Sequence, residues 1–416
     1  MKSQTMCVLP WNHLYAAPDG YVRPCCVSNP DPYHRGEENL SEVDVPTALN
    51  SPSMKLVRKQ MVMGLKPKTC SNCYESERVH GHSDRLDKNE SYELENKLDY
   101  LSSITNIDGS INKFEIQYID IRFSNLCNFR CRMCSHRFSS SWYEEAIELH
   151  DDIEWFLSDN LDEKVVQIDK YGDLWDKLEP YLGGLEYIYF AGGEPLVTDY
   201  HYRILEKLIE IGNFPHLHYN TNLSKLKYKQ YDLLEMWKYF PSIMLSVSLD
   251  GSKEQGEYIR KGMKWDIILK NREIIREKCP RVNISVHCVL QVTNSLHFIK
   301  FFTELLRTNF VDNPTEVSID CLSWPNFQSV TILPENVKDR VKRRVGVFKK
   351  WIINEYPHTN DHLLNELDNF VDYMYSKDHT DYLPIYFDNM KKLDKIRNEN
   401  LLNVFPELKV LAGEIK

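Results

Sequence analysis

The sequence lacks any long uninterrupted apolar run. No stretch approaches the roughly 20 apolar residues that crossing a bilayer requires, and residues 1–6 have none of the apolar core of a secretory signal. We therefore expect a cytoplasmic protein with no membrane partner. A formal net charge of −10 argues against a general binder of polyanions, so nucleic acid is not an expected partner.

Size and cysteine content set further limits. At 416 residues the chain exceeds the usual single-core size of about 250 to 300, so two or more packed units are expected. In a reducing compartment, the 11 cysteines are expected to be metal ligands more than disulfides. Most lie in two compact groups. The thiols outside these groups, in or beside apolar stretches, are expected to be free: Cys279, Cys288 and Cys321.

The most informative group is the run from Cys127 to Cys134. Three thiolates, at Cys127, Cys131 and Cys134, can hold a 4Fe-4S cube and leave its fourth iron open for a substrate or cofactor. Residues 116–123 just upstream alternate between apolar and polar, which predicts a strand. The cysteines then lie on the loop after the carboxyl end of that strand, where α/β barrels carry their chemistry.

A second box strengthens this interpretation. Gly192-Gly193-Glu194-Pro195 follows another predicted strand, and together with Cys-x3-Cys-x2-Cys it closely resembles the radical S-adenosylmethionine (SAM) enzymes. Met133 replaces the usual aromatic residue before the third cysteine and still provides an apolar neighbour. The alternatives are a zinc site and a chance cluster of buried thiols. Zinc prefers four ligands in two paired knuckles, a scheme with no place for this box.

The second cysteine group is at the amino end. Asp19-Gly20 predicts a tight hairpin turn that brings Cys7 and Cys25 together across two strands. The Cys-x2-Cys knuckle at Cys70 and Cys73 supplies two more thiolates, enough to close a second cluster.

This spacing resembles the twitch module, the shortened relative of the SPASM module that holds an auxiliary 4Fe-4S cluster in many radical SAM enzymes. Such modules usually follow the barrel, whereas this one precedes it. Two points stay open. A structural zinc would suit the same four cysteines, and Cys26 is a spare thiol, a replacement ligand or a packing residue.

The middle of the chain alternates strands and helices, which predicts an α/β fold with a parallel sheet. Six strands are expected, the number in the partial (β/α)6 TIM-like barrel that the resemblance implies; they cover 116–123, 187–191, 216–221, 243–249, 282–290 and 315–321. Two helices are expected within 138–182, and three in a helical C-terminal region, at 337–356, 362–375 and 386–402. The expected domains are a cysteine-rich module at 1–85, a connector at 86–114, the barrel at 115–325 and a helical cap at 326–416.

The resemblance also implies residue roles. Gly192, Gly193 and Glu194 would accept hydrogen bonds from the amino group of SAM. Ser248 would contact its ribose, and Arg260 would pair with its carboxylate. Two asparagines that end predicted strands are further candidates for the SAM site, with loop capping as the equal alternative for each: Asn222 and Asn294.

The implied activity is reductive cleavage of SAM to a 5′-deoxyadenosyl radical that removes a hydrogen atom from a substrate. The cofactors would be two 4Fe-4S clusters and SAM, with flavodoxin or ferredoxin as electron donor. A peptide or protein side chain is the leading substrate, with the auxiliary cluster assisting oxidation or crosslinking. The alternatives are a small-molecule dehydrogenase of the sugar-alcohol type and a non-catalytic electron-transfer protein. No catalytic acid or base is assigned.

One basic stretch remains. Residues 338–350 contain seven Lys or Arg and one Asp. A solvated helix face is the simpler interpretation, and a docking patch for nucleic acid or an acidic peptide is the alternative.

Overall fold

The computed structural model describes residues 3–29, 39–150, 161–358 and 361–413. The chain divides into two compact units. The first comprises residues 1–125, 165–218 and 239–242, and the second comprises 126–164, 219–238 and 243–416. Among the described residues, no helix has the length and apolar character that spanning a membrane requires.

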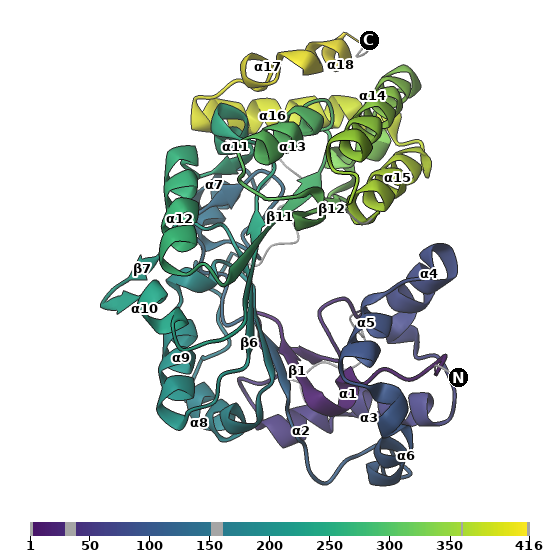
Figure 1. Cartoon of the computed structure of the whole chain (residues 1–416), viewed down its shortest axis with the longest axis vertical. Coiled ribbons are helices and arrows are strands. Elements are labelled where there is room, and N and C mark those ends of the chain that lie inside the picture. Colours follow the sequence, from purple (N-terminus) through teal and green to yellow (C-terminus); the bar gives the residue numbers. More distant parts are fainter. Residues whose placement is uncertain (1–2, 30–38, 151–160, 359–360, 414–416) are drawn as a thin grey trace. The chain divides into compact units, whose positions relative to one another are not determined.

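The first unit is built on four strands, in the order β2, β1, β3, β5. Strand β1 is drawn in purple in Figure 1. Strand β1 (His13–Ala16) pairs antiparallel with β2 (Val22–Arg23) and parallel with β3 (Tyr118–Ile121), which is parallel to β5 (Tyr187–Phe190). The hairpin predicted at Asp19-Gly20 is confirmed, because Gly20 has φ +89° and its N–H donates to the Ala17 carbonyl at 2.8 Å.

Helices make up the rest of the first unit. The stretch expected to be a connector, 86–114, contains the end of one helix and the whole of another. The helices are α1 (Leu9–Asn12), α2 (Val45–Leu49), α3 (Pro52–Val62), α4 (Ser71–His80), α5 (Asp84–Ser91), α6 (Leu94–Ile104), α8 (Leu174–Leu178) and α9 (Asp199–Ile211). The apolar faces of α1, α3, α4 and α6 pack, with Tyr118 at the start of β3, around a core that includes Trp11, Met61, Leu94 and Leu101.

The second unit contains three parallel strands, β9 (Ile243–Ser248), β11 (Val282–Leu290) and β12 (Val317–Cys321), with β11 in the middle. Strand β6 (His216–Thr221) has residues in both units. Alternate residues of β9 are fully buried, as their apolar and polar alternation predicts. Short strands also pair here: β4 (Arg130–Cys131) with β10 (Arg260–Lys261), and β7 (Lys227–Tyr228) with β8 (Tyr231–Asp232).

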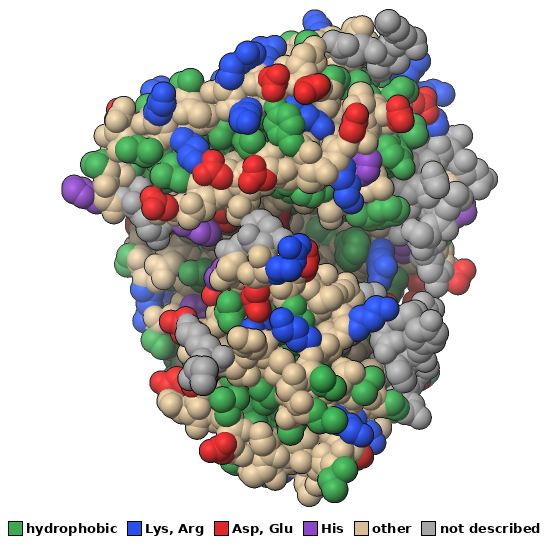
Figure 2. Space-filling view, turned by 90° about the vertical axis from the view of Figure 1, so that its right-hand side faces the viewer, with side chains coloured by type: hydrophobic (Ala, Val, Ile, Leu, Met, Phe, Trp, Pro, Cys, Tyr) green, Lys and Arg blue, Asp and Glu red, His purple; other side chains and the backbone are tan. Residues whose placement is uncertain are grey.

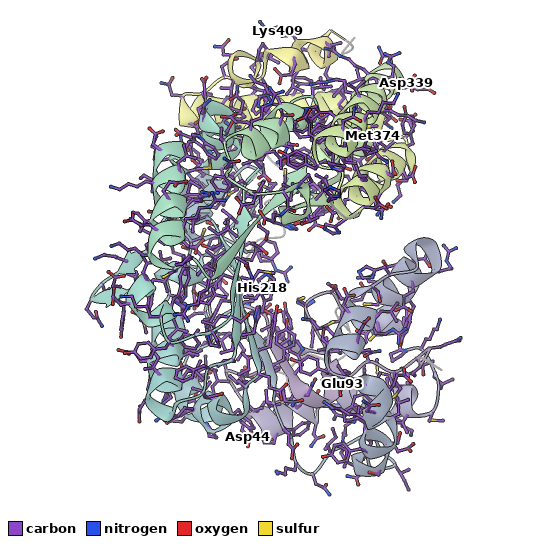
Figure 3. The ribbon with its side chains drawn as sticks, in the orientation of Figure 1. Asp44, Glu93, His218, Asp339, Met374 and Lys409 are labelled. Carbon is purple, nitrogen blue, oxygen red and sulfur yellow. The ribbon has the colours of Figure 1, made fainter. Side chains whose placement is uncertain are left out.

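The helices of the second unit connect these strands and form the C-terminal region, where α15 packs on β12. They are α7 (Tyr143–Glu148), α10 (Leu233–Trp237), α11 (Lys253–Ile259), α12 (Trp265–Lys278), α13 (Phe298–Arg307), α14 (Glu335–Glu355), α15 (His362–Tyr375), α16 (Leu383–Arg397), α17 (Leu401–Val404) and α18 (Lys409–Ala412). In Figure 3, Asp339 lies on α14 and Met374 lies on α15.

The predicted α/β class is confirmed. Each of the six expected strand regions contains a strand, the number in the predicted partial (β/α)6 barrel. Helices α7 and α8 lie within 138–182, where two helices are expected, although residues 151–160 of that stretch are outside the described part. The last predicted helix differs: α16 begins at Leu383 and ends at Arg397, because Asn398 takes a left-handed conformation with φ +51°.

Candidate iron-sulfur and SAM sites

The loop Cys127–Cys134, here called the cluster loop, is fixed in the second unit by main-chain hydrogen bonds. Cys131 lies in β4 and faces Arg260 of β10 in the antiparallel pair. The Arg132 N–H donates to the Ile259 carbonyl at 2.8 Å, and the Cys134 N–H donates to the Cys131 carbonyl at 2.9 Å. The loop is therefore positioned by the segment that carries Arg260.

The three thiols of the cluster loop lie close enough to affect one another. The Cys134 thiol donates a hydrogen bond to the Cys131 sulfur, which lowers the pKa of Cys131 and raises the pKa of Cys134. Charge on Cys127 raises the pKa of Cys134 as well. Arg260 Nη1 lies 3.9 Å from Cys131 Sγ and favours its thiolate.

Arg260 is held by a buried carboxylate. Its Nε lies 2.8 Å from Asp250 Oδ2, and the Asp250 side chain is fully buried. Burial disfavours the charged guanidinium, but Asp250 and Cys131 outweigh it and raise the pKa of Arg260 above its ordinary value. Asp250 Oδ1 also accepts the Val289 N–H at 2.8 Å. A permanent cation is thus fixed beside the cysteines, and the role of Asp250 in fixing it is one that the sequence analysis missed.

Side chains of the C-terminal region bind Arg132 of the cluster loop, whose own side chain is fully buried. Its Nη2 donates to Asp394 Oδ1 and to Glu399 Oε2, each at 2.6 Å. Its guanidinium carbon lies 3.6 Å from the centroid of the Tyr258 ring. Lys261 Nζ completes the group by donating to Glu399 Oε1 at 2.6 Å. We call these residues the Arg132 clamp.

A second buried arginine reinforces the clamp from α16. Arg397 Nη2 donates to the Arg130 carbonyl at 3.0 Å and to Glu145 Oε2 at 2.7 Å. Its guanidinium carbon lies 4.5 Å from the centroid of the Trp142 ring. The Trp142 Nε1–H in turn donates to the Cys131 carbonyl at 3.1 Å. Side chains from two separate parts of the second unit, α16 and the segment that contains Trp142, therefore fix the main chain around Cys131.

The asparagines and the serine predicted for the SAM site have defined partners. Asn222 Nδ2 donates to Asn128 Oδ1 of the cluster loop at 2.9 Å. The Ser248 hydroxyl donates to Asn220 Oδ1 at 2.9 Å. Asn294 is fully buried, and its amide bonds main-chain groups of residues 250, 289 and 291. Asn222 thus contacts the cluster loop, whereas the contacts of Asn294 are those of a loop brace.

The Gly192-Gly193-Glu194 segment lies in the first unit, after β5. Gly192 has φ +109°, and a Cβ placed there would lie 3.1 Å from Arg122 Cβ, so the turn favours glycine. The Gly193 N–H donates to the Ser124 carbonyl at 3.3 Å. Glu194 is buried, and its Oε1 accepts the Leu196 N–H at 3.1 Å.

The amino-terminal thiols gather in the apolar core of the first unit. Burial raises the pKa of Cys7 and Cys70 to about 12 and also raises the pKa values of Cys25 and Cys73. Charge on Cys7, Cys26, Cys70 or Cys73 raises the pKa of Cys25 further, so these thiols lie near Cys25. Such thiols lose their protons when a metal centre binds.

Cys26 has a different neighbour from the other amino-terminal thiols. Burial and the adjacent Asp120 raise the pKa of Cys26 to about 12, and its thiol donates a hydrogen bond to the Asp120 carboxylate. Asp120 is fully buried on β3, and its Oδ1 lies 3.4 Å from Arg122 Nε. Asp120 and Arg122 were not predicted as site residues, because the strand pattern alone does not show that the cysteine module packs beside them.

The donor chemistry of both thiol groups fits iron-sulfur clusters, whose ligands are cysteine thiolates. Throughout the described ranges, no three His, Cys, Asp or Glu side chains are arranged to hold a metal ion. The fit to clusters therefore rests on thiol composition and proximity: three thiols beside a fixed arginine in one unit and four thiols in an apolar core in the other.

Comparison with protein families defines the class. Residues 121–302 match the model of the Radical SAM superfamily, and residues 7–74 match the SPASM model, described as an iron-sulfur cluster-binding domain. The resemblance to radical SAM enzymes with an amino-terminal SPASM-like module is confirmed by these two matches. The chain is thus similar to the Radical SAM superfamily over residues 121–302 and, ahead of that region, to an iron-sulfur cluster-binding domain.

Solved structures with related folds are distant. Native anSMEcpe with bound AdoMet and Cp18Cys peptide is 14% identical over 52% of this chain and 55% of that chain, with a TM-score of 0.36. Native anSMEcpe with bound AdoMet is 20% identical over 47% and 49%, with a TM-score of 0.34. Streptococcus suis SuiB bound to precursor peptide SuiA is 13% identical over 79% and 71%, with a TM-score of 0.37.

The chain therefore spans about half the length of the anSMEcpe structures. A comparison with curated proteins finds no match.

Proposed function

We propose that this chain is a radical SAM enzyme that removes a hydrogen atom from a peptide or protein side chain, assisted by an auxiliary 4Fe-4S cluster. The observation that supports it best is the placement of Arg260. This cation lies 3.9 Å from Cys131 Sγ and is fixed by buried Asp250, so a carboxylate-bearing ligand at the cluster loop would find a charge partner in place. The family matches on both cysteine groups support the pairing of two clusters.

The residues would have the following roles. Cys127, Cys131 and Cys134 would hold the first cluster, which with bound SAM supplies the electron and the 5′-deoxyadenosyl radical for hydrogen abstraction. Arg260 would bind the methionine carboxylate. The acceptors for its amino group would be the Gly192 and Gly193 carbonyls and the Glu194 carboxylate, with Ser248 at the ribose.

The remaining residues would support the cluster loop and its surroundings or hold the auxiliary cluster. Asn222 would hold the cluster loop through Asn128, and the buried Asn294 would keep the loop after β11 in shape. Phe129 and Trp142 are buried and would exclude water from the cluster loop. Cys7, Cys25, Cys70 and Cys73 would hold the auxiliary cluster, which would accept an electron from the oxidised substrate. Flavodoxin or ferredoxin would supply the first electron.

The activity is tested on oxygen-free protein with reconstituted clusters. With dithionite and SAM, the protein should form 5′-deoxyadenosine, whereas the triple variant Cys127→Ala/Cys131→Ala/Cys134→Ala should form none. Arg260→Lys keeps a cation but not the planar fork, and should raise the KM for SAM more than it lowers kcat. Absence of 5′-deoxyadenosine from wild-type protein with full iron content would leave an electron-transfer protein as the better description.

The substrate class is tested separately. Candidate peptides incubated under the same conditions should lose two hydrogen atoms, measured by mass spectrometry, in proportion to the 5′-deoxyadenosine formed. Turnover of sugar alcohols, with no change in any peptide, would replace the peptide assignment with a small-molecule dehydrogenase.

A further inference from the structure

A groove on the second unit gathers arginines without carboxylate partners. It lies between α13 and α14 and has a cavity volume of about 510 Å3. Its charged residues are Arg307, Arg340, Arg343 and Arg344, and its apolar lining includes Val347 and Trp351. We call it the arginine groove. It contains three of the seven basic residues of the stretch 338–350.

The charge of the groove is not neutralised within the chain. Across the ranges that the structure describes, no ion pair joins any of its four arginines to a carboxylate. Asp339, the single acid of the stretch, accepts the Tyr375 hydroxyl at 2.5 Å. By contrast, Lys349 on the same helix lies 2.5 Å from Asp368. In a protein of net charge −10, four unpaired guanidiniums in one groove attract anions locally.

One arginine is oriented by the fold. Arg344 Nη1 donates to the Leu296 carbonyl at 2.6 Å, which fixes the side chain against the turn before α13. Glu407, the carboxylate that acts on Arg344, lies 3.1 Å from His297 Nδ1. Burial and the neighbouring Arg340 lower the pKa of Arg344, so a negative ligand would relieve repulsion already present there.

The lining adds an apolar component. The Val347 side chain is 70% exposed although it lies within the groove. The Arg307 guanidinium carbon lies 5.8 Å from the centroid of the Trp351 ring, so a charged group stands beside an aromatic face. Figure 2 shows Lys and Arg interspersed with Asp, Glu and hydrophobic side chains over the upper part of its face. The lining of the groove itself, guanidinium groups beside apolar side chains, suits a ligand that has both carboxylates and an apolar group.

We propose that the arginine groove binds an acidic peptide segment through one large apolar side chain and two or more carboxylates. The assignment rests on the proposed peptide substrate, and it would place a recognition segment of that substrate on α13 and α14. Bidentate carboxylate pairing suits guanidinium groups, and a cavity of about 510 Å3 accommodates an anchoring side chain. A longer polyanion such as RNA would meet the acidic remainder of the surface, so a short acidic segment fits the charge distribution better.

The test measures binding alone, on the full-length protein without SAM or reductant. The probe is a fluorescein-labelled peptide of about twelve residues, made of Glu and Ser with one central Phe, followed by fluorescence anisotropy. The variant Arg340→Glu/Arg343→Glu should weaken binding at least about tenfold. The control Lys342→Glu/Lys350→Glu makes the same charge change on exposed α14 residues outside the groove and should change binding less than about twofold.

A second variant addresses the apolar anchor. Trp351→Ala should remove the preference for the Phe peptide over the same peptide with Ala, and thermal unfolding of each variant checks that the fold is retained. Equal weakening by the groove and control pairs, or tighter binding of an oligothymidylate of equal charge, would overturn the assignment. If a substrate peptide is known and Arg340→Glu/Arg343→Glu modifies it with unchanged kcat/KM, the groove assignment fails and the proposed function stands. If the groove binds the probe peptide but no peptide is modified, the groove assignment stands and the proposed function fails.

Discussion

The two groups of cysteines are supported mainly by different kinds of interaction. Buried ion pairs hold the cluster loop: Arg132 lies between Asp394 and Glu399, and Arg260 lies against Asp250. An apolar core that includes Met61, Leu94 and Leu101 provides most of the support around the amino-terminal thiols, together with one ion pair, Arg85 to Glu77. Charged side chains fix direction as well as distance, whereas apolar packing fixes mainly volume.

This difference agrees with the proposed roles. An open iron must present one corner to SAM, so the loop that holds it needs a defined orientation, which paired guanidiniums provide. A cluster with four protein ligands needs only to be enclosed and kept from water. The comparison predicts that each region fails when its own kind of support is removed, and that the other region survives.

The largest effect is expected from Arg132→Met. The substitution keeps most of the side-chain volume but leaves Asp394 without its arginine and Glu399 with Lys261 alone. In a largely buried site, this should cost about 3–5 kcal/mol of unfolding free energy. Urea unfolding measures this cost, and iron analysis should show loss of the first cluster with retention of the second. Arg78→Met, in an exposed pair with Glu75, is the control and should leave both quantities unchanged.

A smaller effect is expected from Leu94→Ala in the first unit. Leu94 is fully buried in the core that contains Cys7 and Cys70, and its truncation should cost about 2–4 kcal/mol through lost burial and a residual cavity. On heating, Leu94→Ala should lose the amino-terminal cluster before the cluster held by the cluster loop. Leu65→Ala, at a residue that is 50% exposed, provides the matched control. If heating Leu94→Ala released the cluster of the cluster loop before the amino-terminal cluster, the comparison would be wrong.

The smallest effect is a difference in pH response. Burial lowers the pKa of His13 from 6.5 to about 3, so the unfolded chain binds a proton below pH 6.5 that the folded first unit does not. The stability that His13 contributes is complete above pH 6.5 and is lost as the pH falls toward 3. Between pH 7.5 and 5.5 the loss should be about 1.4 kcal/mol.

His13→Gln should abolish that part of the pH dependence, measured by urea unfolding at the two pH values. The ion pairs of Glu399 in the Arg132 clamp should not change between pH 7.5 and 5.5. Although burial alone would raise the pKa of Glu399, Lys261 and Arg132 lower it below its usual 4.5, so Glu399 stays ionised. An unchanged pH dependence in His13→Gln would show that other groups dominate.

The sequence predicted the parts of this molecule that depend on short-range pattern. Each of the six expected strands is present, because alternation along a few residues is enough to show a half-buried strand. The Asp19-Gly20 hairpin was predictable for the same reason, because the residues of a tight turn themselves determine its backbone conformation. The cysteine spacing pointed to the two regions that match the Radical SAM and iron-sulfur cluster-binding models.

The contacts that were missed join residues far apart in the chain. Arg132 and Asp394 are separated by 262 positions, and each looks like an ordinary charged residue in its own segment. The parallel pairing of His13 with Tyr118, which brings the cysteine module beside β3, likewise has no local signal. Long-range partners of this kind are set by the fold as a whole, and one sequence does not specify them.

The central claim is that the cluster held by Cys127, Cys131 and Cys134 binds SAM directly. The most direct measurement is the electron paramagnetic resonance spectrum of the dithionite-reduced protein, recorded with and without SAM. The account predicts that SAM shifts the signal of the wild-type protein and leaves that of Cys127→Ala/Cys131→Ala/Cys134→Ala unchanged. A wild-type spectrum that SAM does not alter, from protein with its full complement of iron, would contradict it.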